Sequence, residues 1–600
     1  MSKRSKNKKR AYQEPKKPAP AQKEKNLPIK LIARYWKVLL QALLIVSAGA
    51  WLFSPALSAP FFGDDDVYLF NNALLLDPDR LWKAWFEPGS FIEYYPLEQT
   101  VQWCQYELWG LHNTLGYHLT NLVLHIVSAL LLWYLLSKFG LKLAWLGGLI
   151  FVIHPMMVDT VAVACELKST LSLPPFLLAM CFYLDYAERK RGRDYWLALG
   201  LFLVAMLCKI TMTFFPIIIL VHAWWKNGRI TLRDLWVSAP FFIISLVLGW
   251  TTVHAGVVYA AATHYVSPGP IYLGGFFSRA ALVGLTLNFY LAHCFFPVLP
   301  MPFYPQWQID PPSLWQFLFW LPIALIIYCC WLKRQSWGRH ITLGLLFFTL
   351  GLLPLLGVMQ TSYMCLLWVE DHFLYIPIIG IIALIVAGLD HGMRQLPKKI
   401  IPPCIGAIIL VMALYAFQTY SYEKLFSNPV QLWTYNLQYN PDMWMLRYFS
   451  GNFHLAKGDA KGAIEQLEFS LKINPDFPNT YLSLGQAFDQ IGKTPEAIDS
   501  YEKILKITPE NPLARYRLSY DFILIKRYPE AIEQLERILQ THPNFEKAHY
   551  ALGVVLEVTG RESEAMEHYE NALDLVPNDV DAQNCLVRVK NFLASTSTQK

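Results

Sequence analysis

The sequence predicts an all-α membrane protein, in which a polytopic helix bundle is followed by an α-solenoid of short helical repeats. Two observations carry this prediction. Hydrophobic residues make up 54% of the 600-residue chain and charged residues only 16%, whereas soluble domains carry roughly 25% charged residues. Near the C-terminus, prolines recur at a fixed spacing. A small soluble enzyme, a secreted disulfide scaffold and a disordered protein are therefore excluded.

Charge is distributed unevenly along the chain. Residues 1–37 hold 13 Lys and Arg against 2 Glu, and residues 441–600 hold 17 Lys and Arg against 23 Asp and Glu. The net charge of +6 thus comes mainly from the N-terminal tail, and no nucleic-acid partner is predicted. Residues 1–33 are expected to form a disordered, basic tail, which the neighbouring Lys and Arg residues hold in the cytoplasm.

The region 34–420 is expected to be the membrane domain, with about eleven spans. The apolar runs are 35–53, 119–137, 142–163, 171–187, 195–209, 211–225, 235–254, 315–332, 341–357, 373–390 and 400–420. Basic turns such as 188–193 and 226–229 place one end of the bundle in the cytoplasm. The loop 55–118, with nine acidic and two basic residues, is placed on the opposite side, together with the C-terminal repeats.

Segment 276–297 does not fit this alternation, and we interpret it as a re-entrant or interfacial helix. The resulting prediction is an integral protein of the plasma membrane, the inner membrane in a bacterium. Its N-terminus is cytoplasmic and its repeats lie on the outer, periplasmic side.

The C-terminal repeats have a period of 34 residues, set by five prolines: Pro441, Pro475, Pro509, Pro543 and Pro577. Small residues recur in register at Ala463, Ala497, Ala531 and Ala565. This pattern is typical of tetratricopeptide repeats, with two helices per unit. It predicts a connector or half-repeat at 421–443, four repeats at 444–577, and a capping helix and tail at 578–600. Such arrays usually bind a protein or peptide, although a purely structural spacer is the alternative.

Three consecutive acids, Asp64, Asp65 and Asp66, follow the first span in the sequence GDDDVYLFNN. Like charges this close repel each other, so they usually require a cation, a basic partner or a reaction. A carboxylate at the membrane surface could act as general base on a hydroxyl acceptor. It could also hold a divalent cation against a lipid phosphate. A solvated acidic turn is the simpler alternative, and the metal ligands stay undefined.

Further polar residues lie at the same predicted side of the membrane. His118, Asn121 and His125 share one face of a span, a costly arrangement that usually faces the protein interior or a cavity. The other polar residues predicted at this side of the membrane are His154, Asp159, Glu166, Lys168, Lys209, Glu370, Asp371 and His372. Acids and cations from separate segments are thus expected to surround an anionic, lipid-linked substrate. The sequence contains no P-loop, GxGxxG, GxSxG or HExxH motif.

Several motifs occur in an order that resembles a known family: GDDDVYLFNN, YYPL (94–97), HLTNLVLH (118–125), FVIHP, ELKSTLS, CKITMTFFP (208–216) and EDHFLYIP. With the repeats, residues 34–594 resemble the transmembrane and tetratricopeptide-repeat-containing family, and the ELKSTLS form suggests a bacterial member. Members are similar to protein O-mannosyltransferases of the GT-C class, which use polyprenyl-phosphate sugars. By this resemblance the acidic pair falls on Asp64 and Asp65, the HP motif on His154, and the basic positions on Lys168 and Lys209. Tyr95 and His372 stand where the family often has Arg.

The resemblance implies a glycosyltransferase that moves a sugar, mannose or similar, from a polyprenyl-phosphate donor to a protein or glycan. Asp64 or Asp65 would be the base, and Lys168, Lys209 and His372 would bind the donor phosphate. The remaining residues are expected to bind substrate: Asp66, Tyr95, His118, Asn121, His125, His154, Asp159, Glu166, Glu370 and Asp371. A non-enzymatic membrane scaffold and a transporter of lipid-linked glycans are the alternatives. The expected partners are the donor lipid, a protein acceptor and the bilayer.

Overall fold

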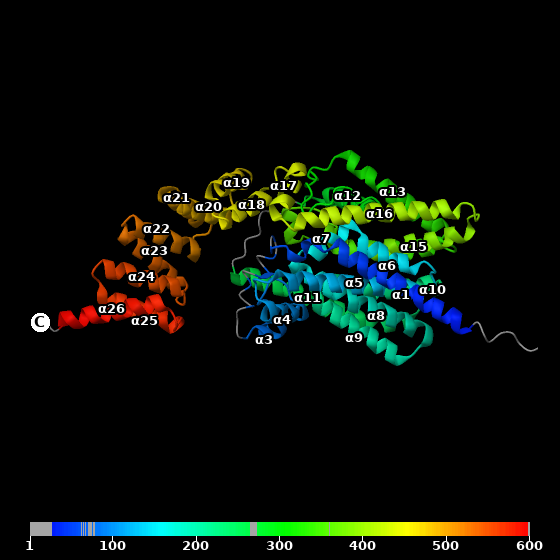
Figure 1. Cartoon of the computed structure of the whole chain (residues 1–600), viewed down its shortest axis with the longest axis horizontal. Helices are drawn as coiled ribbons and strands as arrows, with labels where there is room; N and C mark the ends of the chain where they lie inside the picture. Colours follow the sequence, from blue (N-terminus) through cyan, green and yellow to red (C-terminus); the bar gives the residue numbers. More distant parts are fainter. Residues whose placement is uncertain are drawn as a thin grey trace, which may run out of the picture.

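The computed structural model describes residues 27–61, 63, 65, 68–69, 72, 75, 79–263, 273–358 and 360–597. Within this part of the chain the regular structure is helical and no strand occurs, so the predicted all-α class is confirmed. Most of the basic tail lies outside the described residues, as do Asp64 and Asp66. The molecule is elongated, with a helix bundle at one end and a curved row of helix pairs at the other (Figure 1).

Thirteen helices build the bundle between the first apolar segment and the repeats, together with short 3-10 turns. They are α1 (Leu27–Leu52), α5 (Thr114–Lys138), α6 (Ala144–Ile153), α7 (Val158–Ala162), α8 (Leu167–Arg189), α9 (Gly192–Cys208), α10 (Phe215–Asn227), α11 (Leu232–Thr263), α12 (Phe276–His293), α13 (Trp320–Leu332), α14 (Gly338–Leu352), α15 (Ile378–Gln395) and α16 (Ile401–Phe426). Two more helices, α3 (Arg80–Phe86) and α4 (Pro96–Trp109), lie in the acidic loop. The bundle shares one continuous apolar core that reaches from α1 to α17 (Pro429–Tyr439), the helix that follows α16.

Fewer helices than the eleven predicted spans are long and apolar enough to be candidate spans by themselves. Eight helices among the described residues are long and apolar enough to cross a membrane, or nine if the bent pair α6–α7 is one span. The expected count of eleven included α9 and α10, which are separate helices of only 17 and 13 residues. At 1.5 Å per residue, 13 residues cover only about 20 Å of a hydrocarbon core of about 30 Å. The predicted re-entrant segment forms α12, which is not among these candidate spans.

Two interruptions of the helices place polar residues at one end of the bundle. Helix α6 ends before His154, whose extended conformation follows from the proline at 155. The α6–α7 pair is bent by 61° at this point. A second break lies at Lys209, which is extended between α9 and the 3-10 turn η5 (Ile210–Phe214). Interrupted backbone of this kind is tolerated at membrane depth only where protein or a cavity surrounds it.

The solenoid consists of helix α17 (Pro429–Tyr439), four helix pairs and a last helix. The pairs are α18–α19 (Trp444–Ala456, Ala460–Ile473), α20–α21 (Pro478–Gln490, Thr494–Ile507), α22–α23 (Pro512–Leu524, Tyr528–Thr541) and α24–α25 (Glu546–Val558, Glu562–Leu575), followed by α26 (Val580–Ser597). The recurring alanines are fully buried. A Cβ added to Gly485 or Gly553 would lie 2.5 and 2.7 Å from Tyr501 and Tyr569. These small residues therefore allow the two helices of a unit to cross closely.

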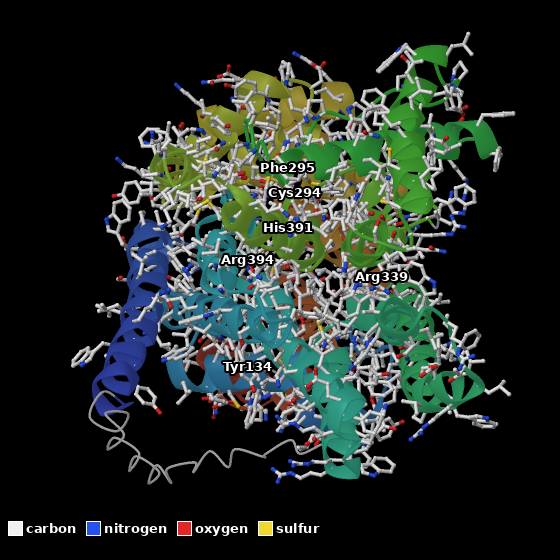
Figure 2. The ribbon with its side chains drawn as sticks, turned by 90° about the vertical axis from the view of Figure 1, so that its right-hand side faces the viewer. Tyr134, Cys294, Phe295, Arg339, His391 and Arg394 are labelled. Carbon is white, nitrogen blue, oxygen red and sulfur yellow. The ribbon has the colours of Figure 1, made fainter. Side chains whose placement is uncertain are left out.

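The solenoid continues from α16 at the end of the bundle where α3 and α4 lie, as Figure 1 shows. Figure 2 views the molecule from the other end and labels Arg339, His391 and Arg394 there. These residues belong to the basic turns of the sequence, and Arg394 forms an ion pair with Asp390. The acidic loop and the solenoid thus share one end of the bundle, and basic turns occupy the other.

Candidate functional site

The centre of the candidate site is an ion-pair cluster around Glu166, which is 5% exposed at the start of α8. The Nζ atom of Lys209 donates to the Ser169 hydroxyl at 2.6 Å and lies 3.4 Å from Glu166 Oε2. The Ser169 hydroxyl also donates to Glu166. His372 Nε2 lies 3.9 Å from Glu166 Oε1. The break at Lys209 and the turn before α15 therefore bring two predicted cations to one carboxylate.

His372 is surrounded by acids. Its Nδ1 atom lies 2.9 Å from Asp159 Oδ2, and its Nε2 atom lies 3.0 Å from Glu370 Oε2. Burial alone would lower the pKa of His372, but Glu166, Glu370 and Asp159 together raise it to about 9. The ring is therefore an imidazolium at neutral pH. His372 thus supplies a cation at the position where the sequence motifs led us to expect arginine.

Lys168 belongs to a second group of polar residues next to the first. Its Nζ atom donates to Glu93 Oε2 and to the Tyr68 hydroxyl, each at 3.0 Å. The Tyr68 hydroxyl donates to Glu93 at 2.7 Å. Burial alone would raise the pKa of Glu93, but Lys168 and Tyr68 bring it below its usual value. Lys168 therefore has a close, charged partner, Glu93, which was not among the predicted site residues.

Asp65 lies directly beside the Glu166 cluster. It is fully buried, and its Oδ1 atom accepts a hydrogen bond from the backbone N–H of Cys165 at 2.8 Å. Cys165 belongs to η4 (Ala164–Glu166), the turn that carries Glu166. The acidic motif and the predicted phosphate-binding cations thus meet at one turn, although 100 residues separate Asp65 from Cys165 in sequence.

Glu98 is an acid of this site that sequence reasoning missed. It lies in the first turn of α4 and is 2% exposed, and its Oε1 atom has no hydrogen-bond partner among the described residues. Burial raises the pKa of Glu98 to about 8, with Glu93 and Glu166 adding to the rise while Lys168 and Lys209 oppose it. Glu98 is therefore mostly protonated at neutral pH. Strongly shifted carboxyl groups are common at functional sites.

Tyr95 precedes α4 and is 5% exposed. Its hydroxyl lies near the backbone of Ile210, next to Lys209. Burial raises its pKa well above the usual range, and the charge of Glu93 adds to this rise. Tyr95 is therefore a neutral phenol next to the break at Lys209.

The other predicted residues contact backbone or neighbouring helices around the cluster. Asn121 donates to Val163 O at 2.9 Å and accepts from the Thr170 hydroxyl at 2.9 Å. The remaining contacts join His118 to Ala59 O (3.1 Å), His125 to the Tyr375 hydroxyl (3.1 Å) and His154 to Cys294 O (3.3 Å). Asp371 accepts from the hydroxyls of Tyr304 and Tyr422. These contacts connect helices, and they do not place the three histidines in the ion-pair cluster.

A possible divalent cation has no complete set of ligands among the described residues. No three His, Cys, Asp or Glu side chains there are arranged to hold a metal ion. Four acids of the site instead face a lysine or a histidine: Glu93, Glu166, Asp159 and Glu370. Asp64 and Asp66, the other acids proposed for such an ion, lie outside the described residues.

Comparisons with known proteins agree with the two parts of the fold. A family model described as dolichyl-phosphate-mannose-protein mannosyltransferase matches residues 96–253. Tetratricopeptide-repeat models match residues 450–512, 490–553 and 546–579.

Among curated proteins, the Homo sapiens "Protein O-mannosyl-transferase TMTC1" is 23% identical over 501 residues, which are 74% of this chain and 56% of that protein. The chain thus spans about half the length of the curated relative that it matches. Among solved structures, MamA is 28% identical, covering 24% of this chain and 84% of its own, with a TM-score of 0.23. YrrB, described as a tetratricopeptide-repeat protein with an unusual peptide-binding site, is 17% identical, covering 29% and 87%, with a TM-score of 0.25. The chain is thus similar to mannosyltransferases over part of its membrane region and to tetratricopeptide repeats over its C-terminal part, the combination that the sequence motifs predicted.

Proposed function

We propose that the protein is a GT-C-type glycosyltransferase that moves a sugar from a polyprenyl-phosphate donor to a protein or glycan on the outer face of the membrane. One observation carries this proposal: acidic side chains hold Lys168, Lys209 and His372 at one end of the bundle, beside Asp65. Such a group of cations suits a phosphate that becomes a leaving group, because charge-assisted hydrogen bonds stabilise its developing negative charge.

In the proposed reaction, an acceptor hydroxyl attacks the anomeric carbon of the donor sugar. The bond between that carbon and the phosphate oxygen breaks, and polyprenyl phosphate leaves with the bonding electrons. Asp65, alone or with Asp64, takes the proton of the hydroxyl. The cations of the cluster stabilise the departing phosphate, and Glu98, in its protonated form, adds no negative charge beside it.

Lys209 is the cation that we assign as the main contact of the donor phosphate. Its shortest hydrogen bond goes to the neutral Ser169 hydroxyl, and Glu166 lies farther away at 3.4 Å. Lys168 instead has Glu93 at 3.0 Å and the Tyr68 ring centroid at 4.2 Å. The positive charge of Lys209 is therefore the less compensated of the two.

A substitution series with purified protein and polyprenyl-phosphate mannose tests this assignment. Lys209→Met should weaken donor use by about 10- to 100-fold, since a charge-assisted hydrogen bond contributes about 1.5–3 kcal/mol. Lys168→Met should have a smaller effect on donor use. Lys138→Met is the matched control, because Lys138 also forms a partly buried ion pair, with Asp185 at 2.7 Å, but at the other end of α5. Equal donor use by the Lys209 and Lys138 variants would contradict the assignment.

The proposal also fixes the orientation in the membrane, the plasma membrane or a bacterial inner membrane. The N-terminus and the turn near Gly192 lie in the cytoplasm, and the solenoid lies outside, where it presents a protein acceptor. Reporter fusions at Gly192 and Lys600 should therefore give opposite readouts. If both report the cytoplasm, the solenoid cannot present an acceptor on the outer face. If labelled donor moves between leaflets without being consumed, the protein is a transporter.

A further inference from the structure

The segment 356–377, which joins α14 to α15, contacts both the ion-pair cluster and the solenoid. It carries Glu370 and His372. The His372 ring contacts both Glu370 and Asp159. The Tyr290 hydroxyl donates to the carbonyl of Glu370 and accepts from its N–H, both at 3.0 Å. The backbone next to His372 is therefore held at a defined position.

Asp371 contacts the helix that leads into the solenoid. It is fully buried. The hydroxyl of Tyr304 donates to its Oδ1 atom at 2.7 Å, and the hydroxyl of Tyr422 donates to its Oδ2 atom at 3.1 Å. Tyr422 lies near the C-terminal end of α16. Since Asp371 and His372 begin the same 3-10 turn, η9 (Asp371–Leu374), a shift of one must move the other.

Tyr304 is connected to the same helices through the segment 295–304. The Tyr415 hydroxyl, on α16, donates to Phe295 O at 2.8 Å. On α17, the Tyr435 hydroxyl donates to Pro300 O at 3.2 Å. Both hydrogen bonds that Asp371 accepts therefore come from parts of the chain that are attached to α16 and α17.

The solenoid itself packs on the segment 356–377. Leu367 is fully buried in a small apolar cluster with Trp433 of α17 and Leu446 of α18, the first helix of the first repeat. Close-packed interfaces of this kind transmit displacement rather than absorb it. A movement of α17 or α18 would therefore reach the segment that holds His372.

We propose that Asp371 is a positioning residue, which holds His372 in the donor site at a place set by α16, α17 and the first repeat. This inference rests on the proposed role of His372 as a donor-phosphate contact. Its consequence is that an acceptor bound to the solenoid changes donor binding through Tyr304, Tyr422 and the Leu367 cluster. Displacements of about 1 Å at a reacting group can cost about 100-fold in rate, so a small shift of His372 is sufficient.

A double-mutant cycle on the full-length protein tests this inference, with binding of undecaprenyl phosphate as the readout. His372→Gln should weaken binding by about 10-fold or more, because it removes a charge-assisted contact. The pair Tyr304→Phe and Tyr422→Phe should weaken binding severalfold in the native background. The same pair should change it by less than twofold in the His372→Gln background. Trp433→Ala should follow the same pattern.

Tyr195→Phe is the matched control, because it removes a hydroxyl that donates to Val237 O at 3.1 Å, outside the contacts that hold Asp371. It should leave binding unchanged in both backgrounds. Tyr422→Phe alone serves if the double variant does not fold. Equal effects of the tyrosine variants with and without His372 would overturn the positioning role. No effect of Trp433→Ala would overturn the link to the solenoid. No effect of His372→Gln would contradict the donor role of His372 in the proposed function.

Discussion

The solenoid and the ion-pair cluster differ in how their residues come together. In the solenoid, neighbours in space are neighbours in sequence: each unit repeats after 34 residues, and Gly485 and Tyr501 meet within one helix pair. In the cluster, Asp65, Lys209 and His372 come from three distant segments and meet where helices are interrupted. The solenoid can therefore tolerate local change, whereas the cluster depends on the whole bundle.

The largest effect is expected at Asp65, which has no equivalent in the solenoid. Asp65→Asn keeps an oxygen that can accept from the Cys165 N–H but removes the proposed base. Loss of general-base catalysis typically costs about 10²- to 10⁴-fold in rate. Transfer rates of the purified variant should fall by that amount while thermal unfolding stays close to native. The control is Asp79→Asn, since Asp79 is exposed before α3, and this variant should be nearly silent.

In the solenoid, a close helix crossing can be disturbed without touching the cluster. A side chain at Gly485 would collide with the Tyr501 ring, 2.5 Å from the added Cβ. Gly485→Val should therefore destabilise the solenoid by about 1–3 kcal/mol, as overpacking usually does. Limited proteolysis of 444–597 should speed up, and transfer to a protein acceptor should fall more than transfer to a small soluble one. Gly492 has a positive φ, and a Cβ added there would meet no neighbouring atom. Gly492→Val therefore measures the effect of backbone strain without a side-chain collision. Equal loss with both acceptors would show that the two regions are not separable.

The contacts of the solenoid are local in sequence and those of the cluster are not, and this difference explains which parts could be predicted from the sequence. The repeats were predictable because period, proline and small residues are local signals, and the fold class is confirmed. Asp65, Lys209, His372, Asp159 and Glu166 were predicted as one group because each lies at the end of an apolar run, and the structure brings them together. Glu93 and Glu98 were missed, because a single acid in a loop gives no signal until the fold buries it next to Lys168.

Long-range contacts also explain why the partners of the buried histidines and the lengths of two apolar helices could not be predicted. His118, His125 and His154 are polar residues inside apolar runs, a pattern that predicts burial but not the partner. Their partners are a carbonyl, a phenol and a carbonyl from distant segments. Helices α9 and α10 follow the predicted runs, but their lengths depend on the break at Lys209, which hydropathy alone does not place.

A smaller effect is expected from raising the pH. It should change stability and donor affinity through the ion-pair cluster and not through the exposed ion pairs of the solenoid. The pKa of His372 is raised to about 9 by its acidic neighbours. The stabilising contribution of this imidazolium is thus complete below its unfolded value of about 6.5 and is lost as pH rises through 9. Affinity for undecaprenyl phosphate should fall over the same range. His372→Gln should remove this alkaline step, and a step of unchanged size in that variant would contradict the assignment.

The smallest effect at neutral pH is expected at Glu98. Its pKa of about 8 means that the folded protein holds a neutral carboxyl, so the fold becomes less stable as pH rises above the usual pKa of the group, about 4.3, toward 8. Glu98→Gln mimics the protonated form. It should leave activity at pH 7 nearly unchanged and should increase thermal stability relative to the native protein at pH 9. Lower stability of the variant at pH 9 would show that the ionised carboxyl has a partner in the fold.

The most direct test of the account is to measure the consumption of polyprenyl-phosphate mannose by the purified full-length protein. Native protein and the Asp65→Asn and Lys209→Met variants should be compared at equal amounts of folded protein, with release of polyprenyl phosphate as the readout. The account predicts turnover by the native protein, a loss of about 100-fold or more with Asp65→Asn, and reduced donor use with Lys209→Met. Near-native turnover by both variants would contradict the proposed cluster mechanism.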